Sequence, residues 1–235
     1  MAGIARRGFI PSDRTEFNDD NIRLLQEAKA DICNLLDRGY SMDKTIEFIG
    51  NHYLLSSRQR LALKRSLASS DDIKRRLEHE VKTPPNDSTV HIDGLNLIIT
   101  LEVALSGSTL LLGMDGAIRD LAGLRGTYTL IDKTDMAIDL IGKKLSELKV
   151  KKVIFYLDSP VSNTGKLKHK IIELLSNHNF ELEVILVQNA DVILNKLENV
   201  ATSDGIILNS CKSWINLGWM IIRDDMLQLS YVDLR

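Results

Sequence analysis

The sequence predicts an α/β fold with a central, mostly parallel sheet, preceded by a small all-helical domain. In the second half of the chain, short apolar runs alternate with segments of helical spacing, which is typical of parallel strands covered by helices on both faces. The first half shows helical spacing only. Between them, KTPPNDST contains two prolines and turn-forming residues that end a helix. We therefore expect a helical bundle at 1–83, a linker at 84–89 and an α/β domain at 90–235.

The composition is that of an ordinary globular protein. Of the 235 residues, 44% are hydrophobic and 26% are charged, and the net charge of -2 gives no argument for binding to nucleic acids or membranes. Two cysteines, Cys33 and Cys211, are too few for a disulfide framework or a cysteine zinc site. No apolar run approaches the roughly 18 residues that span a bilayer, and the basic N-terminus lacks the apolar core of a signal peptide. We expect a cytoplasmic protein.

We expect four short helices in the first half of the chain. Their apolar residues recur with a period close to 3.6, and residues that start or end helices separate them. These residues are Asp19 or Asp20 before the first helix, Gly39 after it, Ser41 before the second, Ser56 with Gln59 as a capping box before the third, and Ser70 before the fourth, which runs towards Val81.

One stretch of the helical half is strongly basic. Residues 58–76 carry seven basic and two acidic side chains, a local balance of +5. Because neutralised phosphates release counterions, such a face can bind nucleic acid without reading its sequence. The candidate contacts include Arg58, Arg60, Lys64 and Arg65. The alternative is a solvated helix face, which is what most charge runs are.

The second half alternates between strands and helices. We expect strands at 89–92, 151–158, 181–188, 198–204 and 219–225, and helices at 95–105, 137–148, 166–175, 191–197 and 205–217. Connections between parallel strands are right-handed, so the carboxyl ends of these strands lie along one edge of the sheet. Ligands of open α/β sheets bind at that edge, near the point where the strand order reverses.

Four aspartates follow strands at this edge. Asp93, Asp158 and Asp204 stand where apolar strands stop, and Asp191 follows a fourth strand and opens a helix. Like charges at such a short separation are unfavourable unless a cation neutralises them. Hard oxygen ligands suit Mg²⁺ or Mn²⁺ rather than zinc. Each aspartate alone has an alternative interpretation as a helix cap or turn residue. Together they predict a metal site formed by all four.

Three short motifs resemble those of PIN-like nucleases, especially the NYN branch. HIDGLN, residues 91–96, is similar to the opening strand that ends in Asp-Gly and is soon followed by Asn. NADVIL, with Asp191, is similar to the acidic helix start before the fourth strand. ATSDGIIL, with Asp204, resembles the Thr-Ser-Asp motif at the end of that strand. The resemblance covers residues 90–223, and the order of the motifs carries more weight than any one of them.

This resemblance implies a three-layer PIN-like sandwich with metal-dependent endoribonuclease activity on single-stranded or structured RNA. The four aspartates would be the catalytic metal ligands, since two cations can activate a water and stabilise the leaving oxygen of a phosphodiester. Asn96 would orient Asp93 or a metal-bound water. Thr202 and Ser203 would hold the carboxylate of Asp204 or contact phosphate. PIN-like domains often dimerise, so a homodimer is one expectation.

The chain as a whole also resembles an uncharacterised archaeal family with a helical N-terminal domain, through GNHYLLSSRQRLAL and YLDSPVSNTGK. It departs from the simplest PIN-like pattern in a long insert at 106–134. The insert contains Asp115, Arg119, Asp120, Arg125 and Asp132. One of its acids can enter the metal site, or the insert can bind substrate, and the sequence leaves both open.

A loop between a strand and a helix, LDSPVSNTGKLK, is a candidate phosphate contact. Hydroxyls, a glycine and a lysine before a helix start suit an anion, because free backbone N–H groups and the helix dipole favour negative charge. The candidate residues are Ser162, Asn163, Thr164 and Lys166. The loop lacks the first glycine of a Walker A motif, and a plain capped turn is the alternative.

Two other functions compete with a ribonuclease. One is a non-catalytic RNA-binding protein that keeps the fold and uses its basic helices. The other is a magnesium-dependent phosphatase, although the first strand lacks the Asp-x-Asp pair of haloacid-dehalogenase-type enzymes. Trp214 and Trp219 can stack on a base, but their places beside a predicted turn favour core positions.

Overall fold

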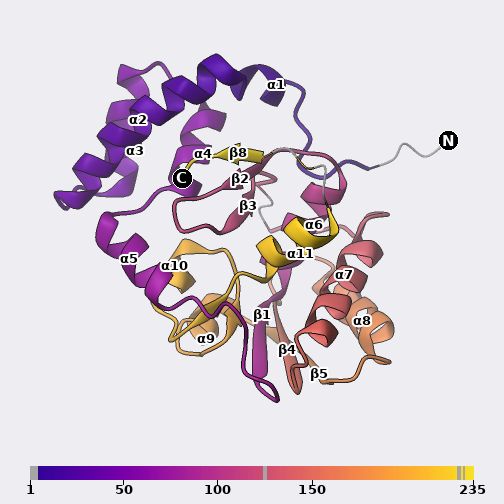
Figure 1. Cartoon of the computed structure of the whole chain (residues 1–235). Helices are drawn as coiled ribbons and strands as arrows, with labels where there is room; N and C mark the ends of the chain where they lie inside the picture. The colour runs from indigo at the N-terminus through magenta and orange to yellow at the C-terminus, as the bar shows by residue number, and fades with distance from the viewer. Residues whose placement is uncertain (1–4, 124–125, 227–228, 230) are drawn as a thin grey trace.

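A five-stranded parallel sheet forms the centre of the second half of the chain (Figure 1). The computed structural model describes residues 5–123, 126–226, 229 and 231–235. The strand order is β5-β4-β1-β6-β7, and every neighbouring pair is parallel. The strands are β1 Thr89–Asp93, β4 Lys152–Asp158, β5 Glu181–Val187, β6 Val200–Ala201 and β7 Trp214–Ile215.

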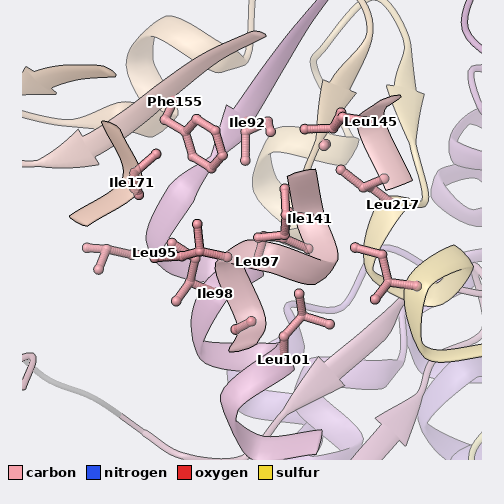
Figure 2. Close-up of a cluster of buried hydrophobic side chains, with 14 of the residues drawn as sticks. Ile92, Leu95, Leu97, Ile98, Leu101, Ile141, Leu145, Phe155, Ile171 and Leu217 are labelled. Carbon is pink, nitrogen blue, oxygen red and sulfur yellow. The ribbon is translucent and has the colours of Figure 1, made fainter. Parts of the chain in front are cut away.

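Helices cover both faces of this sheet. One face packs against α6 Gly94–Leu105, α7 Thr134–Glu147, α8 Thr164–Leu175 and α11 Leu217–Asp225. The other carries α9 Ala190–Leu194 and α10 Gly205–Leu208. Figure 2 shows the first of these cores, where Ile92 and Phe155 of the strands face Leu97 and Ile141 of the helices. The predicted α/β class with a mostly parallel sheet is therefore confirmed.

The first half is helical, as predicted, although two helices begin differently and a short helix, α1, precedes the four that we expected. The helices are α1 Asp13–Glu16, α2 Asp19–Asp37, α3 Met42–His52, α4 Ser57–Ser66 and α5 Ser70–Glu78. The capping box of Ser56 and Gln59 is present. The cap of α2 is Asn18, not Asp19 or Asp20, and the cap of α5 is Ser69, not Ser70, because these side chains accept the N–H three residues on.

A second sheet links the helical half to the rest of the chain. It contains β2 Leu110–Leu112 and β3 Ile118–Asp120 from the insert, and β8 Tyr231–Asp233 from the C-terminal end, in the order β3-β2-β8. Leu111, Val232 and Leu234 are buried in one core with the apolar faces of α2, α3 and α4. The helical half therefore packs on strands that belong to the second half of the sequence.

Two element predictions near the C-terminus are wrong. The helix expected at 205–217 ends at Leu208, and the strand expected at 219–225 is the helix α11. A short apolar run such as WMII fits a buried strand and a buried helix equally well, so periodicity cannot separate them. Trp214 lies in β7 and is fully buried, which agrees with its expected core position.

No helix in the described parts of the chain combines the length and apolar character needed to cross a membrane.

Candidate active site at the carboxyl ends of the strands

The order of the main sheet reverses beside β1. From β1 the chain continues to β4 and β5 on one side, and then crosses to β6 and β7 on the other. Asp93 is the last residue of β1, and Asp204 follows β6 as the N-cap of α10. The hydroxyl of Thr202 donates to Oδ2 of Asp93 at 2.9 Å and accepts the backbone N–H of Asp204 at 3.1 Å. One threonine thus joins the two aspartates across the point where ligands bind in open α/β sheets.

Asn96 fixes the same turn from the first turn of α6. Its Oδ1 accepts both the backbone N–H of Ser203, at 3.0 Å, and the Ser203 hydroxyl, at 2.9 Å. We expected Asn96 to orient Asp93, and Thr202 and Ser203 to hold Asp204. The side chains are connected differently: Thr202 donates to Asp93, and the Asn96 side chain holds Ser203, while the Asn96 backbone bonds the carboxylate of Asp93. The expected roles toward a metal-bound water and toward phosphate stay predictions.

Close packing between α6 and β4 explains why a glycine follows Asp93. A Cβ atom there would lie 2.6 Å from a side-chain carbon of Leu157 and 3.1 Å from the carbonyl oxygen of Tyr156. A larger residue would force the Leu157 side chain to move and would crowd the backbone of β4. The close approach keeps the start of α6, and with it Asn96, at the sheet edge.

Asp158 and Asp191 occupy the other side of the edge. Asp158 ends β4, and its Oδ1 accepts the backbone N–H of Ala190 at 2.8 Å. This bond ties the start of α9, which carries Asp191, to the end of β4. Burial, and then the charges of Asp204 and Asp158, raise the pKa of Asp191.

Asp93 is the buried member of the group, with 7% of its surface exposed. Burial is the main cause that raises its pKa from 3.8 to about 7, and the carboxylates of Asp204 and Asp191 raise it further. The four aspartates from four strand ends are therefore electrostatically coupled. None of them forms an ion pair with a basic residue in the described part of the chain.

This oxygen-rich group fits a divalent cation by its chemistry. Its carboxylates repel one another and have no basic partner within the described ranges, and a hard cation such as Mg²⁺ or Mn²⁺ would relieve that repulsion. Among the described residues, no three His, Cys, Asp or Glu side chains already stand close enough to hold a metal. The aspartates thus form an open group rather than a closed coordination shell.

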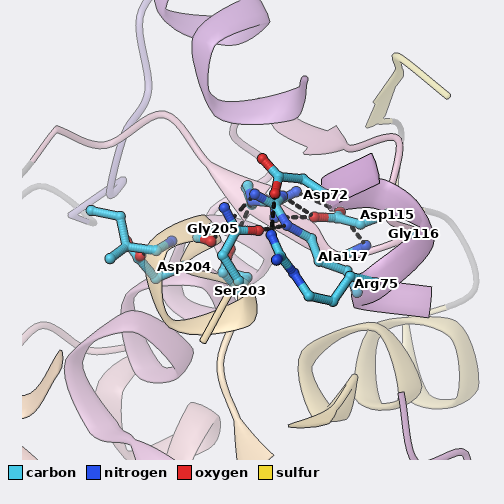
Figure 3. A network of polar contacts seen from close by, with 12 residues as sticks. Asp72, Arg75, Asp115, Gly116, Ala117, Ser203, Asp204 and Gly205 are labelled. Carbon is cyan, nitrogen blue, oxygen red and sulfur yellow. Dashed lines mark hydrogen bonds and ion pairs between the residues drawn. The ribbon is translucent and has the colours of Figure 1, made fainter. Parts of the chain in front are cut away.

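A buried cluster of charges holds the turn that carries Asp204 (Figure 3). Both guanidinium groups of Arg76 and Arg119 pair with Asp115, at 2.7 and 2.6 Å. Arg119 Nε also donates to the carbonyl of Ser203 at 2.7 Å, and Arg76 donates to that of Gly205 at 3.3 Å. The carbonyls on either side of Asp204 are therefore held by two arginines from outside the strand edge.

This cluster was missed by the sequence interpretation. Arg76 comes from α5 and Asp115 and Arg119 from the insert, so no local spacing joins all three. Burial by itself would raise the pKa of Asp115. The charges and hydrogen bonds of Arg119 and Arg76 outweigh burial and lower that pKa to about 2. The insert thus contributes an acid near the site, but this acid is already neutralised.

The predicted basic contacts have different surroundings. Arg58 is turned inward, pairing with Asp13 at 2.7 Å. Arg60 donates to the carbonyl of Leu55. Lys64 is exposed beside Asp43, and Arg65 lies 3.5 Å from Asp120.

The candidate phosphate loop is largely occupied by contacts within the protein. The Ser162 hydroxyl accepts the Tyr128 N–H at 3.1 Å, and Asn163 donates to the Tyr128 carbonyl at 2.7 Å. Thr164 is buried and donates to the carbonyl of Val161. Lys166 is exposed. Ser162 and Asn163 therefore bind Tyr128 of the insert, and Thr164 binds its own loop.

The remaining acids of the insert lie apart from the aspartate group. Asp120 is buried and accepts the Ala122 N–H at 2.7 Å. Asp132 is exposed and pairs with Lys133. Arg125 lies outside the described residues.

Comparison with known proteins identifies the family. A family model described as "Domain of unknown function (DUF5616)" matches residues 84–219, more than half of the chain. The chain belongs to the DUF5616 family. A second model, "Protein of unknown function (DUF434)", matches residues 24–79 in the helical half. The two DUF regions meet near the expected linker.

A relative of this DUF5616 protein occurs in an archaeon. The "Uncharacterized protein MJ0935" of Methanocaldococcus jannaschii is 37% identical over 187 residues, which are 79% of this chain and 89% of the relative. No solved structure matches the chain.

Proposed function

We propose that this DUF5616 protein is a metal-dependent endoribonuclease that hydrolyses RNA phosphodiesters at the carboxyl edge of its main sheet. The observation that carries the proposal is that four aspartates at or after strand ends lie around the point where the strand order reverses, with no ion-pair partner among the described residues. The motif resemblance to PIN-like, NYN-type nucleases supports the same chemistry, and the parallel three-layer architecture is compatible with it.

Each side chain of the site has a separate role in the proposed reaction. Asp93 and Asp204 would bind Mg²⁺ or Mn²⁺ from β1 and from the turn after β6, and Asp191 and Asp158 would contribute from the opposite side. The bound metal would supply activation of water and stabilisation of the leaving oxygen. Thr202 orients Asp93 through its hydroxyl, and Asn96 holds the Ser203 backbone so that Asp204 stays beside it.

Substrate binding is the second part of the proposal. Exposed Lys64 and part-exposed Arg65 lie in the helical half, and exposed Lys166 lies at the start of α8. We assign these three to contacts with RNA phosphates, since cations that neutralise phosphates increase affinity for any RNA sequence. Arg58 is not included, because its guanidinium is buried on Asp13.

The test is cleavage of an end-labelled single-stranded RNA by the purified full chain with MnCl₂, with MgCl₂ or with EDTA. We expect cleavage with a metal and none with EDTA, read on a denaturing gel. RNA that is bound but not cut with either metal would refute the nuclease and favour a non-catalytic RNA-binding protein. Cleavage at equal rates by an Asp204→Asn preparation would reveal a contaminating enzyme and also refute the assignment.

Metal binding can be measured separately by thermal unfolding. A ligand that binds only the folded state at about 100 times its Kd stabilises it by about 2.7 kcal/mol, so MnCl₂ should raise the Tm of the wild-type protein. Asp204→Asn should remove most of this rise, while keeping the cap of α10, because Asn is also a good N-cap. Asp139→Asn, an exposed position on α7, is the control and should respond like the wild type. A Tm that is insensitive to Mn²⁺ and Mg²⁺ would contradict the metal site.

A further inference from the structure

A pocket of about 590 Å³ lies between the helical half and the turn that carries Asp204. One wall comes from the end of α2, the start of α3, and α4 and α5, and the other from residues 203–206 and Asn209. Figure 1 shows α5 next to α10, which is where these two parts of the chain meet. The volume is in the range of small-molecule sites, which is about 300–1,000 Å³.

The apolar part of this pocket includes two unusually exposed side chains. Tyr40 is 58% exposed and Ile206 is 69% exposed, and both line the pocket. A tyrosine ring can stack on any nucleobase, and a branched aliphatic side chain offers a second apolar surface. Leu61 and Met42 extend this surface within the pocket.

Basic residues outnumber acidic residues in the lining of the pocket. Four basic residues and two acidic residues line the pocket, namely Lys64, Arg65, Arg76, Arg119, Asp72 and Asp204. Arg76 and Arg119 share one buried carboxylate, Asp115, so their cluster keeps an excess positive charge. An anion near this floor would be attracted by that excess. Lys64 and Arg65 would contact it in exchange for Asp43 and Asp120, their partners outside the pocket lining.

We infer that this pocket binds one nucleotide of a single-stranded RNA next to the bond that is cleaved, with its base against Tyr40 and Ile206 and its phosphate on Lys64 and Arg65. The inference rests on the proposed function. Asp204 lines the pocket, and the Thr202 hydroxyl joins its backbone N–H to the carboxylate of Asp93. A chain that leaves the pocket past Asp204 therefore enters the aspartate group directly.

The RNA must be unpaired at this nucleotide. A base that occupies a pocket with aromatic and aliphatic walls cannot remain stacked and paired in a duplex, and recognition of splayed bases is characteristic of single-stranded RNA. The helical half would then be part of the substrate site rather than an independent domain.

The experiment measures binding without cleavage. Fluorescence anisotropy of a labelled single-stranded RNA is recorded with the full chain carrying Asp93→Asn, alone and combined with Tyr40→Ala, Tyr40→Phe or Arg65→Gln. We expect Tyr40→Ala to raise Kd about tenfold, the effect of losing one stacked base, and Tyr40→Phe to keep the affinity. Arg65→Gln should raise Kd and reduce the salt slope of log K by about 0.7.

Matched controls lie outside the pocket. Phe48→Ala removes an aromatic ring that is 68% exposed on α3, and Arg23→Gln removes an exposed cation on α2. Both should leave Kd and the salt slope unchanged. Competition with the RNA annealed to its complement should be weak, and a nucleoside monophosphate should compete only at much higher concentration.

The outcomes separate this inference from the proposed function. If RNA is cut by the wild type but Tyr40→Ala binds as tightly as Phe48→Ala, the pocket inference is overturned and the nuclease stands. If RNA binds with the expected dependence on Tyr40 but is never cut, the nuclease fails and the pocket stands. Equal competition by duplex RNA would also overturn the inference.

Discussion

Asp93→Asn should abolish RNA cleavage while making the metal-free protein more stable at pH 8. Loss of one group that stabilises developing charge commonly slows an enzyme by about 10²–10³-fold, and we expect a loss of at least this size. The amide can still accept the hydrogen bond from Thr202 that Asp93 accepts. The folded structure should therefore be retained.

The gain in stability follows from the raised pKa of Asp93. Because burial and two neighbouring carboxylates raise this pKa from 3.8 to about 7, Asp93 favours the folded state fully below about pH 4. That contribution is lost as the pH rises through about 7, at a total cost of roughly 4 kcal/mol. Asn carries no charge to bury, so the mutant should avoid much of this cost.

Urea unfolding in EDTA between pH 4 and pH 8 measures this effect. The wild-type free energy of unfolding should fall across the range, and that of Asp93→Asn should fall less. Asp139→Asn, exposed on α7, should follow the wild type. A mutant that is less stable than the wild type at pH 8 would show that the carboxylate is not under strain, and would remove the argument for a cation at this position.

Asp115→Asn should destabilise the protein by about 3–5 kcal/mol. The change leaves Arg76 and Arg119 buried without a counter-charge, and breaking a buried ion pair from one side costs about this much. Asp43→Asn, which removes an exposed partner of Lys64, should cost no more than about 1 kcal/mol. Urea unfolding at pH 7 compares the two.

The carboxylate of Asp115 also leads to a second, independent prediction, about the stability of the protein at low pH. Its pKa is lowered to about 2, so its stabilising contribution is present above about pH 4 and is lost as the pH falls through 2. The wild type should lose stability over this range, and Asp115→Asn should lose less of it. Equal stability of Asp115→Asn and Asp43→Asn at pH 7 would contradict the assigned role of the cluster.

Much of the architecture could be predicted because it depends on local patterns. β1, β4 and β5 are short segments rich in β-branched and other apolar residues, and α6, α7 and α8 show helical spacing between them. The segment at 205–225 was assigned wrongly because its apolar runs are short. There, Trp214 is buried in β7 and donates to the carbonyl of Arg76, a contact that local spacing does not reveal.

The aspartate group likewise has features that local sequence predicts and features that it does not. That Asp93, Asp158 and Asp204 follow strands is visible in the sequence, and parallel strands bring such residues to one edge. Which hydrogen bonds orient them is not visible, since the bonds Thr202–Asp93 and Asn96–Ser203 each join residues more than a hundred positions apart.

The sequence by itself therefore determined the α/β class, the helical first half and the edge at which the four aspartates gather, because strand periodicity and chain direction are local properties. Only the tertiary structure decided that Arg76 of α5 and Arg119 of the insert hold the turn around Asp204, and that Tyr40 lines a pocket beside it. These contacts depend on the helical half packing against β2 and β8. That packing buries apolar surface from three separate parts of the chain, which no single stretch of sequence encodes.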